Sequence, residues 1–243
     1  MSPTQPSTFR YGEHRDNVVE VWPPTGAGRG TAAVIHGGWW RSDKDLGLMR
    51  ALCAELAGRG WWACNVEYRR IDPGPGGWPA TFDDVCAAIT SLDDLAGPAA
   101  RVAVGHSAGG QLAMLAAAEG LVAGAVGLAP VTDLRRCARA GLGEAATPVF
   151  LGAEPDDAPD RYRSASPIHR IPRRVPQLLV HGDADERVPV EHSRELAAKA
   201  EQLGAPVTLE EFAGAKHLDV IDPAHASWQR VATWLAGRVG RTH

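Results

Sequence analysis

The sequence predicts an α/β protein in which a mostly parallel sheet is covered by helices on both faces. Short apolar segments rich in β-branched residues alternate along nearly the whole chain with segments of helical spacing. Most of the strand segments lack a polar face, which is typical of strands that are buried on both sides of a parallel sheet. The expected strands are residues 31–37, 62–68, 101–106, 121–129, 176–182 and 206–212.

Helices are predicted between and after these strands, where apolar side chains recur three or four positions apart. Another helix, "AGGQLAMLAAA", follows the third strand and is rich in alanine and leucine, which favour helix formation. Region 132–175 has no clear strand and is interrupted by prolines, so we expect a small cap without long helices there. The apolar positions of the spaced helices are Leu46, Met49, Cys53 and Leu56; Val85, Ala88, Ile89 and Leu92; Val190, Leu196, Ala200 and Leu203; and Trp228, Val231 and Leu235.

Length and charge limit the classes of protein to which the chain can belong. Its 243 residues fit one domain of this class, so we expect a single domain over residues 1–243 with the cap inserted at about 132–175. The 25 basic and 29 acidic residues give a net charge of −4 without any basic run, which argues against a nucleic-acid partner. The oligomeric state is left open, with a homodimer among the alternatives.

The lack of a recognisable targeting signal and the spacing of the cysteines predict a cytoplasmic protein. The polar N-terminus, "MSPTQPSTFRYGEH", lacks an apolar leader, and no later run approaches the ~18 apolar residues of a membrane span. We therefore expect a soluble protein without a membrane partner. The four cysteines stand singly, without the spacing of a metal site, and are interpreted as reduced structural residues: Cys53, Cys64, Cys86 and Cys137.

Candidate functional residues follow four of the predicted strands. In an open parallel sheet the carboxyl ends of the strands meet at one edge, and ligands bind there. The four segments are "HGGWW" (36–40), "GHSAG" (105–109), "HGDADERVP" (181–189) and "AGAKHLDV" (213–220).

Ser107 is the candidate nucleophile. It lies between Gly105 and Gly109, as expected for a sharp strand-to-helix turn in which neighbouring Cβ atoms would clash. A serine hydroxyl needs a general base, and His217, in a loop after the last strand, is the best candidate. Asp185 is placed to fix the tautomer of that histidine.

Other acids and histidines have simpler interpretations. Asp183 is an alternative acid that is better explained as a turn residue, and Asp133 is a more distant alternative that is better explained as a helix N-cap. His192 and His225 are expected on helices. The two remaining histidines near the site, His36 and His106, are expected to be structural, since a histidine beside a glycine turn often bonds its own loop.

The segment "HGGWW" supplies the predicted oxyanion site. Glycines remove side chains where the backbone must approach a developing alkoxide, so the N–H groups of Gly38, Trp39 and Ala108 are the expected donors. The indoles of Trp39 and Trp40, together with Trp78 after another glycine-rich turn, are predicted to form aromatic walls that bind the substrate.

These motifs resemble those of α/β-hydrolases, in the family's order of serine, acid and histidine, from about residue 30 to the C-terminus. Within that fold, "HGG", "GHSAGG" and "VEYRR" (66–70) are similar to esterases related to hormone-sensitive lipase. Trp39 replaces the third glycine of their loop, and the form His-Gly-Gly-x-Trp more nearly resembles the arylformamidase branch. That branch hydrolyses N-formyl aromatic amines and often small aryl esters.

The resemblance implies a serine hydrolase that cleaves short-acyl carboxylic esters or aryl formamides in two steps through an acyl-enzyme. The partner is then a small ester or amide substrate, and neither a metal nor an organic cofactor is required. Serine at the elbow argues against the dienelactone-hydrolase and haloalkane-dehalogenase types, which carry Cys and Asp there. Two alternatives stay open: an oligopeptidase-like peptidase, because "HGDADERVP" resembles the acid loop of those enzymes, and a non-catalytic protein of this fold that binds a small ligand.

Overall fold

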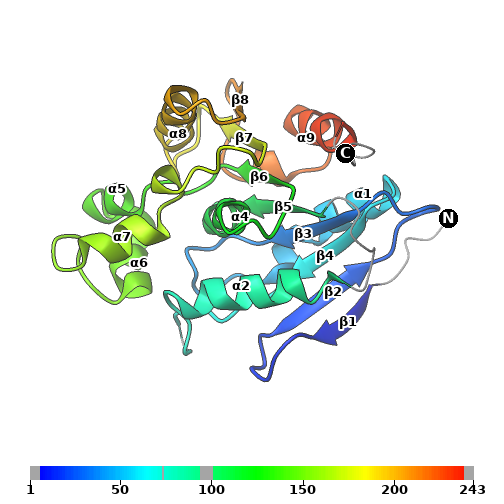
Figure 1. The fold of residues 1–243 in the computed structure, drawn as a ribbon, viewed down its shortest axis with the longest axis horizontal. Coiled ribbons are helices and arrows are strands. Elements are labelled where there is room, and N and C mark those ends of the chain that lie inside the picture. The colour runs from blue at the N-terminus through cyan, green and yellow to red at the C-terminus, as the bar shows by residue number, and fades with distance from the viewer. Residues whose placement is uncertain (1–5, 73, 94–100, 238–243) are drawn as a thin grey trace.

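An eight-stranded sheet forms the centre of the molecule (Figure 1). The computed structural model describes residues 6–72, 74–93 and 101–237. The strand order is β1-β2-β4-β3-β5-β6-β7-β8, in which β1 and β2 run antiparallel to their neighbours and all other pairs are parallel. The strands are β1 (Ser7–Arg10), β2 (Val18–Trp22), β3 (Thr31–Ile35), β4 (Trp62–Val66), β5 (Arg101–His106), β6 (Gly124–Leu128), β7 (Gln177–Gly182) and β8 (Val207–Phe212).

The α/β-hydrolase fold is confirmed, and all six predicted strands are present, one with the predicted bounds and five with somewhat shorter bounds. The antiparallel strands β1 and β2 were not predicted. Both are short, and β1 at the edge of the sheet is largely exposed, so its residues carry no apolar signal.

Helices cover both faces of the sheet, as predicted (Figure 1). The apolar core on one face joins α1 and α9 to the sheet, and the core on the other face joins α2 and α4 to it. Alternation along β3 shows the division, since Ala32 and Val34 belong to the first core and Ala33 and Ile35 to the second. The helices are η1 (Leu46–Met49), α1 (Arg50–Gly58), α2 (Ala80–Thr90), α4 (Ala108–Ala118), α8 (Glu191–Gln202), η3 (Asp219–Ile221) and α9 (Ala226–Ala236).

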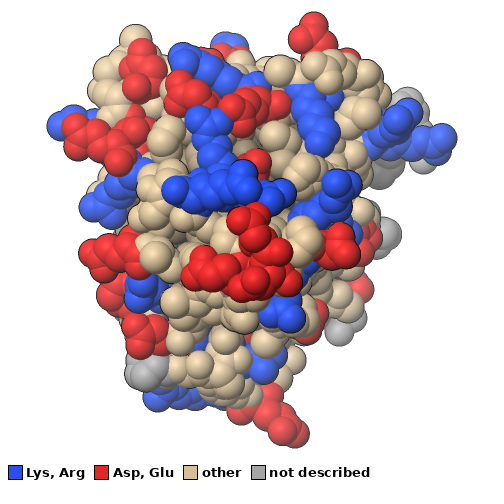
Figure 2. Space-filling view, turned by 90° about the vertical axis from the view of Figure 1, so that its left-hand side faces the viewer, with Lys and Arg blue, Asp and Glu red and all other residues tan. Residues whose placement is uncertain are grey.

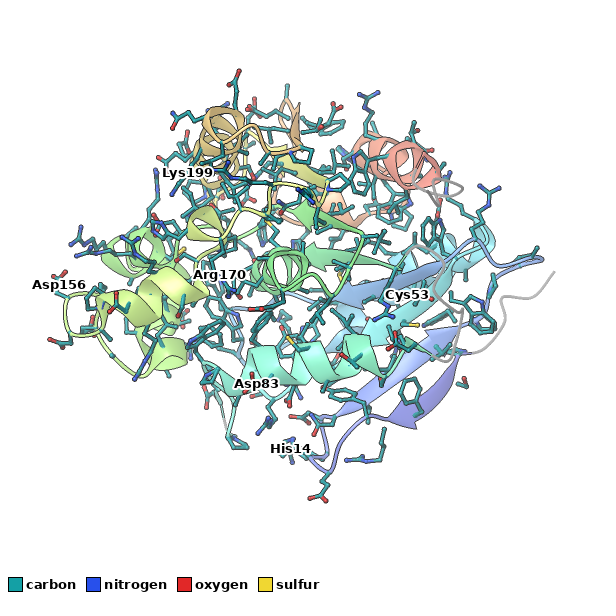
Figure 3. The ribbon with its side chains drawn as sticks, viewed as in Figure 1. His14, Cys53, Asp83, Asp156, Arg170 and Lys199 are labelled. Carbon is teal, nitrogen blue, oxygen red and sulfur yellow. The ribbon has the colours of Figure 1, made fainter. Side chains whose placement is uncertain are left out.

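The cap consists of short helices between β6 and β7, at the left of Figure 1. They are α5 (Leu134–Arg139), α6 (Leu142–Leu151), α7 (Pro159–Ala165) and η2 (Pro167–His169). Asp156 lies at the outer end of the cap (Figure 3), where its Oδ1 accepts hydrogen bonds from Arg135 (2.6 Å) and Arg139 (3.2 Å). The expectation of a cap without long helices is confirmed for this region.

The four cysteines are free, and burial raises the pKa of the Cys64 thiol to about 12, so this thiol is not a nucleophile at neutral pH. Cys53 lies on α1 at the side of the molecule away from the cap (Figure 3).

None of the helices in the described ranges combines the length and the apolar composition that crossing a membrane requires.

Candidate active site

Ser107 occupies a strained turn between β5 and α4. Its backbone angles, φ 56° and ψ −119°, are disfavoured for a residue with a side chain and cost on the order of 1–3 kcal/mol. A Cβ at Gly105 would lie 2.1 Å from the Gly109 carbonyl oxygen, and one at Gly109 would lie 2.2 Å from the Ile35 carbonyl oxygen. No side chain fits at either glycine, so the two residues let the turn close around the serine.

Asp185 and His217 form a hydrogen-bonded pair beside this turn. His217 follows β8, and its Nδ1 lies 2.6 Å from Oδ2 of Asp185, which follows β7. Because a carboxylate only accepts, Nδ1 carries the proton and Nε2 keeps the lone pair that a general base needs. The N–H groups of Arg187 and Val188 donate to the other oxygen, Oδ1, at 2.8 and 2.9 Å. Burial alone would raise the pKa of Asp185, but hydrogen bonds from His181 and His217 hold it well below its usual value.

His181 is a neighbour of the acid that the sequence analysis missed. Its Nε2 donates to the Val188 carbonyl oxygen at 2.9 Å and lies 3.3 Å from Asp185 Oδ2, while its Nδ1 lies 2.7 Å from Ser193 Oγ. His181 lies inside β7, a segment that the sequence predicts as an apolar strand. Its position four residues before Asp185 was the sequence signal that could have identified it as a neighbour of the acid.

His106 joins the nucleophile turn to the loop of the base. Its Nε2 donates to the His217 carbonyl oxygen at 3.0 Å, and the two rings are 4.5 Å apart at 47°. In the described part of the chain, no hydrogen bond links Ser107 Oγ to His217 Nε2. Such bonds are often long in a free enzyme and tighten when substrate binds.

Two buried histidines make stability depend on pH. Burial, helped by nearby cationic or titrating groups, lowers the pKa of His106 to about 3 and that of His192 to about 4. Histidine in the unfolded chain titrates near 6.5, so between pH 6.5 and 4 the unfolded state binds protons that the folded state refuses. We expect the stabilisation to be fully present above pH 6.5 and to be lost as pH falls, by about 1.4 kcal/mol per pH unit for each histidine.

Urea unfolding at several pH values between 4.5 and 7.5 measures this dependence. His192→Asn should make the slope shallower by about 1.4 kcal/mol per pH unit, whatever its effect on stability at pH 7.5. An unchanged slope would show that His192 is not part of the acid sensitivity.

The loop after β3 runs against the nucleophile turn. A Cβ at Gly37 would lie 2.8 Å from Ser107 Cβ, so the backbone passes directly beside the serine. In the described ranges, the N–H groups of Gly38, Trp39 and Ala108 donate to no other group. These are the three donors predicted for the oxyanion site, and their hydrogens are available to a ligand.

The prediction that Trp40 lines the substrate pocket is wrong. Trp39 and Trp40 both have left-handed backbone angles, with φ of 52° and 59°, and this turn directs Trp40 into the core. There its side chain is 0% exposed, stacks on Phe150 at 4.1 Å and donates from Nε1 to Gln111 Oε1 at 3.2 Å. Trp78 is half-buried and stacks on Phe82 at 5.5 Å, and its contact with substrate stays a prediction.

Trp39 lies at the wall of a pocket of about 520 Å³ formed by three segments: the oxyanion loop, the cap and the loop that carries Asp185. A Cβ at Gly143, whose φ is +62°, would lie 2.3 Å from Trp39 Cδ2, so the cap backbone rests on the indole. Arg41 Nη2 holds that part of the cap by donating to the Glu144 carbonyl oxygen at 3.2 Å. The lining residues are Gly38, Trp39, Arg41, Asp43, Lys44, Gly141, Leu142, Gly143, Glu144, Glu186 and Arg187.

The competing candidates have the structural roles that the sequence analysis favoured. Asp183 Oδ1 accepts the Gly214 N–H at 2.6 Å, and no hydrogen bond joins it to His217 in the described ranges. Asp133 caps α5 by accepting the Arg136 N–H at 3.1 Å, which confirms the N-cap. His192 lies in α8, as expected. His225 was also expected on a helix, but it is the N-cap of α9 and lies one residue before the helix begins.

Comparisons with known proteins agree with this fold. The chain is 29% identical to the esterase LipC and 27% identical to the esterase LipQ, both of Mycobacterium tuberculosis, over 88% of its length. It spans 60% and 57% of those two relatives. Among solved structures, it superposes on a truncated carbohydrate esterase from gut microbiota with a TM-score of 0.87 and 19% identity, covering 99% of both chains.

A second solved structure, the esterase Est2 of Thermogutta terrifontis with propionate bound, gives a TM-score of 0.79 at 24% identity, covering 99% of this chain and 96% of that one. At such identities these structures show the fold alone. The family model described as BD-FAE matches residues 22–200, which include the serine turn and the Asp185 loop. The chain therefore belongs to the BD-FAE family of α/β-hydrolase esterases.

Proposed function

We propose that this protein is a serine esterase that hydrolyses short-acyl carboxylic esters through an acyl-enzyme. His217 Nε2 takes the proton of Ser107 as its oxygen attacks the ester carbonyl, and the oxyanion accepts hydrogen bonds from the N–H groups of Gly38, Trp39 and Ala108. The protonated histidine then gives its proton to the leaving alcohol. Water repeats the sequence on the acyl-enzyme and releases the acid.

One observation carries the proposal: the Asp185–His217 pair, at 2.6 Å, lies on the loops beside a serine at φ 56°. The fold alone supports many chemistries, so the argument rests on this site. A strained serine next to a correctly protonated histidine and three free N–H groups is the set of groups that acyl transfer needs.

The comparisons add support for ester substrates with small acyl groups. LipC and LipQ are esterases, and the Thermogutta enzyme has been solved with propionate bound, with butyrate bound and phosphonylated by sarin. A fluorophosphonate probe applied to this protein tests the first step. Labelling with turnover of esters supports the proposal, labelling with turnover of peptides alone favours a peptidase, and the absence of labelling favours a non-catalytic ligand-binding protein.

The pocket beside Trp39 favours a polar leaving group. Six of its lining residues are charged, and no ion-pair or hydrogen-bond partner is found in the described ranges for the side chains of Glu144, Glu186 and Arg187. Figure 2 shows basic and acidic side chains intermixed over the cap face. One indole with carboxylates and a guanidinium suits a hydroxylated alcohol such as a sugar, in line with the carbohydrate esterase of the same fold.

Aryl formamides are the second candidate substrates, supported by the indole of Trp39 on the oxyanion loop. With Trp40 buried, fewer aromatic walls are available than the sequence suggested. Rates on N-formylkynurenine, on an acetylated sugar and on phenyl acetate, measured side by side, separate the two classes.

We expect the rate to fall with acyl-chain length. In the described part of the chain the cap helices are short, and Gly143 packs directly on Trp39, so little apolar depth is available for a long chain. Measurements of kcat/KM for p-nitrophenyl esters from C2 to C16 should show an optimum at C4 or shorter, without activation by lipid surfaces. An optimum at C10 or longer would contradict this expectation.

A further inference from the structure

A buried histidine–glutamate pair lies under the oxyanion loop. His36 follows β3 and Glu67 follows the neighbouring strand β4, so the parallel register places the two residues side by side. Nε2 of His36 lies 2.9 Å from Glu67 Oε1, and the side chains are 0% and 6% exposed. The sequence alone predicts only a structural role for His36 and none for Glu67 in "VEYRR".

Both ring nitrogens of His36 face acceptors. Nδ1 lies 2.7 Å from the Gly37 carbonyl oxygen, which cannot donate, and Nε2 faces the Glu67 carboxylate. Burial would raise the pKa of Glu67, but hydrogen bonds from His36 and from the Leu46 N–H lower it below the usual value. Each ring nitrogen of His36 therefore lies against an acceptor, and the contact at Nδ1 joins the ring to the Gly37 carbonyl oxygen.

The segment after β4 holds this ring in place. Tyr68 stacks on it at 4.4 Å and 8°, and its hydroxyl donates to the His36 carbonyl oxygen at 2.8 Å. Arg70 lies 3.6 Å from Glu67 and donates to the Lys44 carbonyl oxygen at 2.8 Å. The His36 ring therefore has little freedom to turn.

The bond to Gly37 sets the direction of the next N–H group. In a trans peptide the C=O of one residue and the N–H of the next point in opposite directions. Because the Gly37 carbonyl points at His36, the Gly38 N–H points away from it. That N–H has no partner in the described ranges, and its neighbour Gly37 packs against Ser107 Cβ.

We propose that His36, held in place by Glu67, is a positioning residue that fixes the Gly37–Gly38 peptide and so aims the Gly38 N–H at the substrate oxyanion. This inference rests on the proposed esterase function. It gives "VEYRR" a task, which is to form the support under the oxyanion loop.

Two substitutions separate the bonds of His36. Asparagine places its amide N–H near the position of Nδ1, so His36→Asn keeps a donor for Gly37, whereas His36→Gln places it near Nε2 and keeps only the bond to Glu67. On p-nitrophenyl acetate we expect His36→Gln to lower kcat about 10²-fold with little change in KM, since loss of one oxyanion donor costs about 10²–10³. His36→Asn should retain at least about tenfold more of the wild-type kcat than His36→Gln.

A trifluoromethyl ketone provides the readout that a purely structural role would not change. It adds to the serine as a tetrahedral adduct, so its Ki reports on the oxyanion site. Across His36→Gln, His36→Asn and Glu67→Gln, we expect Ki to rise in parallel with the fall in kcat. Glu20→Gln is the matched control. It alters another buried carboxylate, on β2, which accepts hydrogen bonds from Arg50 Nε at 3.1 Å and belongs neither to "VEYRR" nor to the oxyanion loop. It should lower Tm while leaving kcat and Ki unchanged.

The outcomes are distinct for the two proposals. Equal losses in His36→Gln and His36→Asn, or a lower Tm in Glu67→Gln with unchanged Ki, would overturn the positioning role. If the wild type hydrolyses no ester or formamide, the proposed function fails, and the labelling rate with a fluorophosphonate still compares the variants. A labelling rate unchanged in His36→Gln would then overturn the positioning role as well.

Discussion

Replacing Ser107 by alanine is expected to lower kcat for ester hydrolysis by about 10⁶, as loss of the nucleophile does in serine proteases. Alanine keeps the Cβ and the strained backbone, so the change removes only the hydroxyl that would form the acyl bond. Labelling by a fluorophosphonate should disappear at the same time. The kcat and the extent of labelling are both measured on purified Ser107→Ala protein, whose Tm should be close to that of the wild type.

Ser91→Ala is a matched control for this prediction. Ser91 follows α2 and donates to the Ala88 carbonyl oxygen at 2.7 Å, so it belongs to the end of that helix and not to the serine turn. It should label and turn over esters as the wild type does. Turnover that persists in Ser107→Ala would remove this serine from the mechanism.

Asp185→Asn is expected to lower kcat by about 10⁴, with the fold retained. Two N–H groups, from Arg187 and Val188, hold one carboxylate oxygen. In asparagine that position keeps the oxygen, so the NH2 group faces His217 Nδ1. The ring must then accept at Nδ1 and carry its proton on Nε2, which leaves no lone pair for Ser107. Single-turnover kinetics with p-nitrophenyl acetate measure the loss.

Asp183→Asn tests whether the acid is correctly assigned. Asp183 is exposed and binds only the Gly214 N–H among the described residues, so an amide should serve nearly as well as the carboxylate. We expect kcat within about threefold of the wild type, since surface changes of this kind are mild. A larger loss in Asp183→Asn than in Asp185→Asn would exchange the two roles.

Much of the candidate site could be predicted because its residues follow strands. Ser107, Asp185 and His217 each come just after a segment with a strong strand signal, and the carboxyl ends of parallel strands share one edge. The burial of Trp40 could not be predicted from its position after a strand. Its burial depends on left-handed angles at two consecutive tryptophans, and nothing in "HGGWW" distinguishes that turn from one that exposes both indoles.

Residues that act through other residues were the hardest to predict. His181 and Glu67 lie within or just after buried strands, where a polar side chain is easily taken as a gap in an apolar pattern. Their hydrogen-bond partners can be identified only from the structure, in which β7 and β4 lie beside the loops that they support. The antiparallel strands β1 and β2 were missed for a different reason, since short antiparallel strands need no helix between them.

The contact between Gly143 and Trp39 limits how the pocket can be redesigned. Any side chain at position 143 would meet the indole and would also be strained at a φ of +62°, so variation there displaces the oxyanion loop itself. Leu142 and Glu144 flank the same contact and line the pocket. A library that varies these two positions and leaves Gly143 fixed would change the proposed leaving-group pocket while keeping the backbone contact between the cap and the oxyanion loop.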